Sequence, residues 1–186
     1  GFAYGEKENG AVFSHMAVMY ANALYKRGFI KEGYKVLKNL LDSAMDFESS
    51  IMYPGIPEYF DNDGRGLYAY LTGAASWYML TMITEVFGVR GELGNLVIKP
   101  ALLPEQFDKD GKAAIKLNFS GRTLKITIHA DIDNIQDNNG VYNKIIRVEC
   151  DGNELESADL KKVVIMKKRI EEMSCGRCHE IDVFIK

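Results

Sequence analysis

The spacing of apolar residues changes part-way along this chain, and that change constrains its fold more than any other feature. Before about residue 90, apolar side chains recur every three or four positions, as on one face of a helix; after about Leu96 they alternate with polar residues, as in a strand. The 186 residues are enough for two hydrophobic cores. We therefore predict an α+β chain with a helical domain at 1–92 and a strand-rich domain at 93–186, divided near Gly91–Asn95.

Three helices are predicted in the first domain: Val12–Arg27, Ile30–Leu41 and Thr72–Phe87, with Gly28 and Gly88 ending the first and third. The first helix gathers apolar residues on one face: Phe13, Met16, Ala17, Tyr20 and Leu24. The third is apolar around most of its circumference, which predicts burial inside a larger helical assembly. Because two or three helices cannot bury it, we expect part of this domain to lie outside the chain.

The second domain is predicted to be an antiparallel β-sandwich. Leu124, Ile126 and Ile128 alternate with polar residues, and Ser120-Gly121 before them is a hairpin turn signal. Further strands are expected around residues 117–119, 146–150, 163–166 and 179–185, with a second turn at Asp151-Gly152. Short strands separated by such turns are typical of sandwiches.

Composition excludes several classes of partner. The formal net charge is −3, so no basic field attracts nucleic acid or an anionic membrane. The basic residues between Lys161 and Arg169 are interpreted as the solvated flanks of a strand. No apolar stretch approaches the roughly 20 residues of a membrane helix, and no signal peptide is recognisable. The first residue is not Met, so a fragment or a processed product is expected, and three cysteines favour a reducing cytoplasm.

Two positions are candidates for binding an anion. Thr72-Gly73 opens the third helix, where free N–H groups, the helix dipole and a residue without a side chain favour an anion; an ordinary Thr cap is the alternative. His15 lies in the first turn of the first helix, where a neutral imidazole can donate to an anion; a capping or core histidine is the alternative.

Carboxylates and aromatic residues share the loops of this domain. Glu6, Glu8, Glu58, Asp61 and Asp63 can accept protons from sugar hydroxyls, although loops are also acidic for solubility. Five aromatic residues can stack on sugar rings or simply pack in the core: Tyr53, Tyr59, Phe60, Tyr68 and Tyr70.

Three ordered motifs resemble one family, the inverting disaccharide phosphorylases of glycoside hydrolase family 94. Residues 7–15 (KENGAVFSH) are similar to its E-N-G-G-x-F-x-H segment, and residues 71–77 (LTGAASW) to its L-T-G-[TS]-A-[AS]-W segment. Residues 87–90 (FGVR) and 96–100 (LVIKP) resemble its G-V-R…L-x-[IL]-x-P passage. The resemblance covers about residues 1–130. Ala11, Ser14 and the loop at 57–61 depart from the pattern, and this loop is closer to the oligoglucan and laminaribiose branches.

The resemblance implies the last helices of an (α/α)6 barrel followed by a carboxy-terminal β-sandwich. It implies phosphate binding by His15, Thr72 and Gly73, and a place for Glu8 on the sugar side. The family's general acid is an Asp on an earlier barrel segment, so no catalytic residue is expected here and the chain alone should be inactive. Inorganic phosphate and a β-linked gluco-oligosaccharide are the expected substrates, without cofactor or metal.

Other interpretations stay open at this point. The remainder of the barrel is an expected partner, and a homodimer is left open. The alternatives in function are a phosphate-independent barrel glycosidase and a non-catalytic carbohydrate-binding fragment. Cys175-Gly-Arg-Cys178-His179 matches C-x-x-C-H, which can attach haem or hold a metal with Cys150; a hairpin turn with two incidental thiols is the interpretation we adopt.

Overall fold

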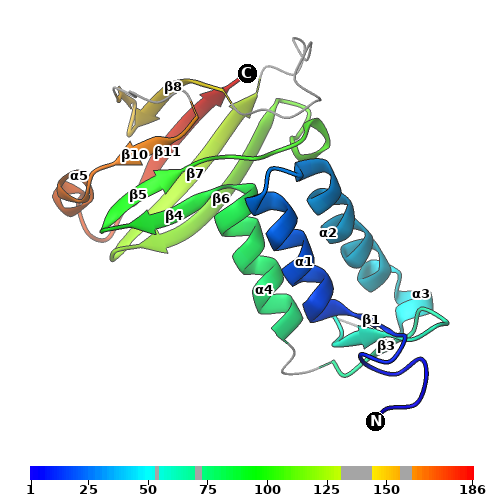
Figure 1. Cartoon of the computed structure of the whole chain (residues 1–186). Coiled ribbons are helices and arrows are strands. Elements are labelled where there is room, and N and C mark those ends of the chain that lie inside the picture. Colours follow the sequence, from blue (N-terminus) through cyan, green and yellow to red (C-terminus); the bar gives the residue numbers. More distant parts are fainter. Residues whose placement is uncertain (53–54, 70–72, 131–143, 156–160) are drawn as a thin grey trace. The chain divides into compact units, whose positions relative to one another are not determined.

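The protein is described by a computed structural model covering residues 1–52, 55–69, 73–130, 144–155 and 161–186 (Figure 1). It forms two compact units, Gly1–Met82 and Ile83–Lys186. The first is mainly helical and the second mainly strands, so the predicted mixed α+β class is confirmed. The division into domains at residue 92 stays a prediction. Around it, strands β4 (Val89–Glu92) and β5 (Asn95–Ile98) form one antiparallel hairpin.

The first unit is built on three neighbouring helices, with α1 in contact with both α2 and α4 (Figure 1). Its helices are α1 (Ser14–Lys26), α2 (Ile30–Met45), the short α3 (Phe47–Ser50) and α4 (Gly73–Thr81). Asn22 on α1 donates a buried hydrogen bond to Thr81 on α4, at 3.1 Å. The Tyr78 hydroxyl of α4 donates to the Leu37 carbonyl of α2, at 3.3 Å. These two polar contacts connect the three helices.

The packed face of α1 differs from the apolar face seen in the sequence. Val18, Ala21 and Tyr25 are buried, whereas Met16 and Tyr20 are exposed. Apolar residues surround much of this helix, so periodicity alone does not select the face; contact with α2 and α4 does.

The third predicted helix changes type before its end. Regular α4 stops at Thr81 and continues as a π-helical turn, η1 (Met82–Val86), so the helical conformation ends within one residue of the predicted Phe87. Within the described residues it is not buried on every side, because Met79 and Leu80 remain exposed.

A small sheet occupies part of the segment that was expected to be a loop. Its strands β1 (Val12–Phe13), β2 (Tyr59–Phe60) and β3 (Gly66–Leu67) pair antiparallel in that order. The pairing brings Glu58 to the start of α1, where its carbonyl accepts the Ser14 N–H at 2.9 Å. One N–H that a helix start leaves unpaired is thereby satisfied.

The second unit contains a five-stranded and a three-stranded sheet. The larger has the order β6 (Lys112–Phe119), β7 (Arg122–Ala130), β11 (Cys178–Ile185), β8 (Ile145–Cys150) and β9 (Asn153–Glu154). The smaller has the order β10 (Val163–Ile165), β5 and β4. The strands expected from the alternating pattern are confirmed.

The pairing is not antiparallel throughout, which corrects the prediction. Strand β11 runs parallel to β7, with Ile181 opposite Ile126 and Val183 opposite Ile128. The reason is that β11 follows a helix and a turn rather than a hairpin, and such a crossover delivers a parallel strand. A closed sandwich stays a prediction.

Two predicted hairpin turns are confirmed by their backbone angles. Ser120 and Gly121 both have positive φ, 48° and 74°, and join β6 to β7. Asp151 and Gly152, at 49° and 76°, join β8 to β9 in the same way. Two successive positive φ values are the signature of the tight turn that suits twisted strands.

The basic segment before residue 170 is partly helical, which corrects its interpretation as strand flanks. Lys167, Lys168 and Arg169 open the short helix α5 (Lys167–Glu172). The Asn95 side chain accepts the Lys167 N–H at 2.8 Å, and so connects α5 to the start of β5. None of the described helices has the length and apolar character needed to cross a bilayer.

Candidate functional site

The starts of α1 and α4 lie together in the first unit. His15 is the second residue of α1, and Gly73 is the first residue of α4 that the structure describes. Further along each helix, Asn22 of α1 donates a hydrogen bond to Thr81 of α4, so the two helices run side by side in the same direction. Their amino ends, which carry partial positive charge, therefore face the same region.

The His15 ring rests directly on the backbone of Gly73. A Cβ atom at Gly73 would lie 2.8 Å from Cε1, 2.9 Å from Nδ1 and 3.2 Å from Nε2 of His15. Only a residue without a side chain leaves that space free. That Gly73 lets an anion approach stays a prediction; the structure shows that the imidazole occupies the space where a side chain would stand.

One nitrogen of the His15 ring is buried without a partner that the structure describes. Nε2 is buried and has no hydrogen-bond partner among the described residues, and the same holds for the adjacent Ser14 Oγ. The Trp77 ring lies one turn beyond Gly73 on α4, with its centroid 5.9 Å from that of His15 and tilted by 47°. A buried polar atom without a partner costs about 1–3 kcal/mol, so such an atom in a native protein marks a place where a ligand or water is expected.

Of the other two predicted site residues, Glu8 alone is described by the structure. Thr72 lies outside the described residues. Glu8 is exposed in the turn between Glu6 and Asn9, and its carboxylate has no hydrogen bond or ion pair within the described part of the chain. Its assignment to the sugar side stays a prediction.

A second cluster near the start of α1 was not foreseen. The Lys7 ammonium lies 3.8 Å from a Glu58 carboxylate oxygen, and 4.8 Å and 5.0 Å from the ring centroids of Tyr68 and Phe2. Lys7 stands within the first motif and Glu58 within the acidic loop, but no local pattern indicates that they meet. The antiparallel pairing of β1 with β2 brings them together.

The C-x-x-C-H segment lies elsewhere, in the second unit. It forms the turn between α5 and β11, and not a hairpin turn, which corrects that part of the interpretation. Cys175 and Cys178 are exposed free thiols, and Cys150 is a buried one. Over the described residues, no group of three or more His, Cys, Asp or Glu side chains is arranged to hold a metal ion.

Comparison with known proteins finds one distant similarity. No family model matches the chain. A cellobionic acid phosphorylase from Neurospora crassa is 26% identical to it over 139 residues, which cover 68% of this chain and 17% of that protein. The chain thus spans about a sixth of the length of the curated relative that it matches. The similarity supports a phosphorylase-like relationship at the level of the family.

Proposed function

We propose that this chain supplies the phosphate-binding part of an inverting phosphorylase that acts on a β-glucoside. The observation that carries the proposal is the His15 ring, seated on Gly73 with a buried Nε2 that has no partner among the described residues. The distant similarity to a cellobionic acid phosphorylase supports the same class of reaction.

In the proposed mechanism, His15 and the start of α4 at Thr72 and Gly73, called the phosphate cradle from here on, hold the nucleophile. Phosphate bound by His15, Thr72 and Gly73 attacks the anomeric carbon from the face opposite the departing sugar. A general acid from another part of the polypeptide protonates the leaving oxygen, and α-glucose 1-phosphate forms with inversion. An inverting hydrolase needs a carboxylate to activate water, whereas phosphate is itself the nucleophile, so one carboxylic acid suffices.

The phosphate cradle suits a dianion for electrostatic reasons. Two helix starts point their partial positive charge at the same region, and an imidazole N–H adds a charge-assisted hydrogen bond of about 1.5–3 kcal/mol. The aligned amino ends also disfavour a competing cation there. We place the protein in the cytoplasm, since three cysteines without the spacing of a disulfide framework favour a reducing compartment.

Trp77 offers a direct binding test, because it is the single tryptophan of the chain and lies beside His15. Titrating inorganic phosphate should change its fluorescence saturably in the native protein, and His15→Ala should weaken that binding about tenfold or more. Sodium chloride at equal ionic strength is the control for unspecific screening.

Kinetics of the full polypeptide separate the alternatives. With phosphate and disaccharide varied separately, His15→Ala and Thr72→Val should raise the KM for phosphate much more than the KM for the sugar. Hydrolysis without phosphate would indicate a glycosidase. Equal losses toward both substrates would mean that these residues only support the fold.

A further inference from the structure

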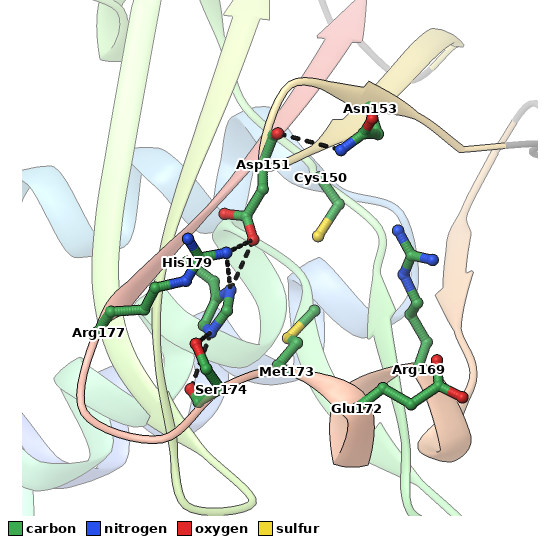
Figure 2. A pocket seen from close by; sticks show the side chains of 9 residues that line it. All are labelled: Cys150, Asp151, Asn153, Arg169, Glu172, Met173, Ser174, Arg177 and His179. Carbon is green, nitrogen blue, oxygen red and sulfur yellow. Dashed lines mark hydrogen bonds and ion pairs between the residues drawn. The ribbon is translucent and has the colours of Figure 1, made fainter.

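A pocket in the second unit has no part in the proposed phosphate chemistry. It has a volume of about 450 Å³, within the range of about 300–1,000 Å³ that is usual for small-molecule sites. Three segments line it: the turn between β8 and β9, helix α5, and the turn that carries the C-x-x-C-H segment (Figure 2).

One side of the pocket is a fixed group of hydrogen-bonded side chains. Asp151 accepts from His179 Nδ1 at 2.7 Å and from Arg177 Nη2 at 2.6 Å through one oxygen, and from the Glu180 N–H at 3.0 Å through the other. The second ring nitrogen of His179 lies 3.0 Å from the Ser174 carbonyl. His179 is only 1% exposed, so this side is rigid and its His–Asp pair has little capacity left for a ligand.

Thiol chemistry does not fit the pocket. Cys150 is buried, and burial together with the Asp151 carboxylate raises the pKa of its thiol, against the opposing effects of Arg169 and Arg177. A nucleophilic cysteine needs the reverse, a depressed pKa and an adjacent base. Both ring nitrogens of His179 are already engaged.

The opposite side presents polar groups that have few partners within the described residues. Arg169 and Glu172 project from α5 at the (i, i+3) spacing of neighbours on one helix face (Figure 2). No hydrogen bond or ion pair of the Glu172 carboxylate is found in the described part of the chain. Among the residues that the structure describes, the polar partner found for Arg169 is the Cys150 thiol, a weak acceptor. The Asn153 amide donates to the Asp151 carbonyl at 3.2 Å, and its oxygen has no partner within the described ranges.

The guanidinium and carboxylate side chains that line the pocket are equal in number, Arg169 and Arg177 against Asp151 and Glu172. These four side chains by themselves therefore set no preference for a cation or an anion. Donors and acceptors both line it, and the sulfur atoms of Cys150 and Met173 lie between its two polar sides (Figure 2). Vicinal hydroxyls both donate and accept, so they can pair with both kinds of group.

We propose that this pocket is a second, non-catalytic binding site for a neutral sugar or polyol. A free amino acid is the other ligand with charges of both signs, but its ammonium and carboxylate would pair with only part of the polar lining. A ligand with several hydroxyls can pair with more of it, which favours a sugar or polyol. This inference does not rest on the proposed function of the first unit.

The test is an NMR titration of the whole chain with cellobiose, following backbone amide shifts. Residues 150–153 and 169–174 should shift saturably, with a Kd of about 1–10 mM. Arg169→Gln and Glu172→Gln should each raise that Kd about fivefold or more. Lys168→Gln, which removes a charge from α5 beside the pocket, should leave it unchanged, and so should His15→Ala.

Several results would overturn the proposal. These are shifts that do not saturate, shifts confined to other residues, tighter binding of glycine than of cellobiose, or equal weakening by Lys168→Gln. Arg169 and Glu172 are both exposed, and each is replaced in a separate variant. If one variant fails to fold, the other still tests the proposal. Since His15→Ala reports only on the first unit, loss of the proposed phosphate site and loss of this sugar site are distinguishable.

Discussion

The imidazole of His15 occupies the space that a side chain on residue 73 would need, with Cε1 only 2.8 Å from the position of a Cβ atom on Gly73. Gly73→Ala should therefore push the ring away from the start of α4 without removing any polar group. We expect the phosphate affinity to fall about tenfold, with a smaller change in sugar affinity. Trp77 fluorescence of the free protein should also change, since the ring beside it moves.

The matched control for this substitution is Gly55→Ala, where a Cβ would meet nothing within 4 Å. It should change neither phosphate binding nor fluorescence. Unaltered phosphate binding by Gly73→Ala would contradict the phosphate cradle.

Glycine at a positive φ can be required by the backbone angle alone or also by a collision that a side chain would cause, and Gly121 and Gly88 are examples of the two cases. At Gly88, with φ of 67°, a Cβ would lie 1.8 Å from the Lys99 carbonyl oxygen, whereas at Gly121, with φ of 74°, it would meet nothing. Gly121→Ala should cost about 1–2 kcal/mol through its backbone angle alone. Gly88→Ala should cost more than about 3 kcal/mol, because backbone must move as well. Denaturant unfolding of the second unit, followed by hydrogen exchange in β5, measures the free energy of unfolding of both variants. Equal losses in the two variants would show that the predicted collision at Gly88 adds no cost.

Tyr78 should make the first unit sensitive to alkali. Burial, with nearby Tyr34 and Asp42, raises the pKa of Tyr78 to about 12, above its unfolded value of about 10. Its contribution to stability is therefore complete below pH of about 10 and is lost as the pH rises toward 12. Tyr78→Phe should remove this dependence, and should cost about 1 kcal/mol at neutral pH through the lost bond to Leu37.

Urea unfolding followed by Trp77 fluorescence at neutral and alkaline pH gives the measurement. Tyr20→Phe is the control, since Tyr20 is 59% exposed. An alkaline loss of stability that persists unchanged in Tyr78→Phe would show that another group is responsible.

Asp151 should give the second unit the opposite dependence, in acid. Burial acts to raise the pKa of Asp151, but hydrogen bonds from His179 and the Glu180 N–H, with the Arg177 charge, hold it below its ordinary value of 3.8. The carboxylate therefore stabilises the fold above pH of about 4, and this stability is lost as the pH falls through the lowered pKa. Asp151→Asn should cost about 2 kcal/mol at neutral pH.

The acid dependence is measured by unfolding the second unit at neutral and low pH, with hydrogen exchange in β8 and β11 as the probe. The exposed Asp110→Asn is the matched control. If Asp151→Asn retained the full acid dependence of the parent, the assignment to Asp151 would be wrong.

The sequence by itself determined the elements that depend on local chemistry. The alternation of Leu124, Ile126 and Ile128 predicted β7, and Ser120-Gly121 predicted the turn before it, because a strand face and a positive φ are properties of a few neighbouring residues. The periodicity predicted α1 to begin two residues early, at Val12, where the structure has strand β1. That His15 and Gly73 share one site was implied by the family resemblance of their motifs.

Only the tertiary structure decided which surfaces meet. It selected Val18, Ala21 and Tyr25 as the buried face of α1, because α2 and α4 pack there and no local rule distinguishes that face from Met16 and Tyr20. It placed β11 parallel to β7, since strand direction depends on where the preceding turn delivers the chain.

The same division applies to the side chains that carry function. The motif named Gly73 but not the reason for it, which is the His15 ring resting on its backbone. The C-x-x-C-H segment drew attention to its cysteines, whereas the fold uses His179, buried against Asp151, and leaves both thiols exposed. Contacts between residues 58 or 28 positions apart form only when helices and strands pack, because long-range burial, and not local propensity, brings those side chains together.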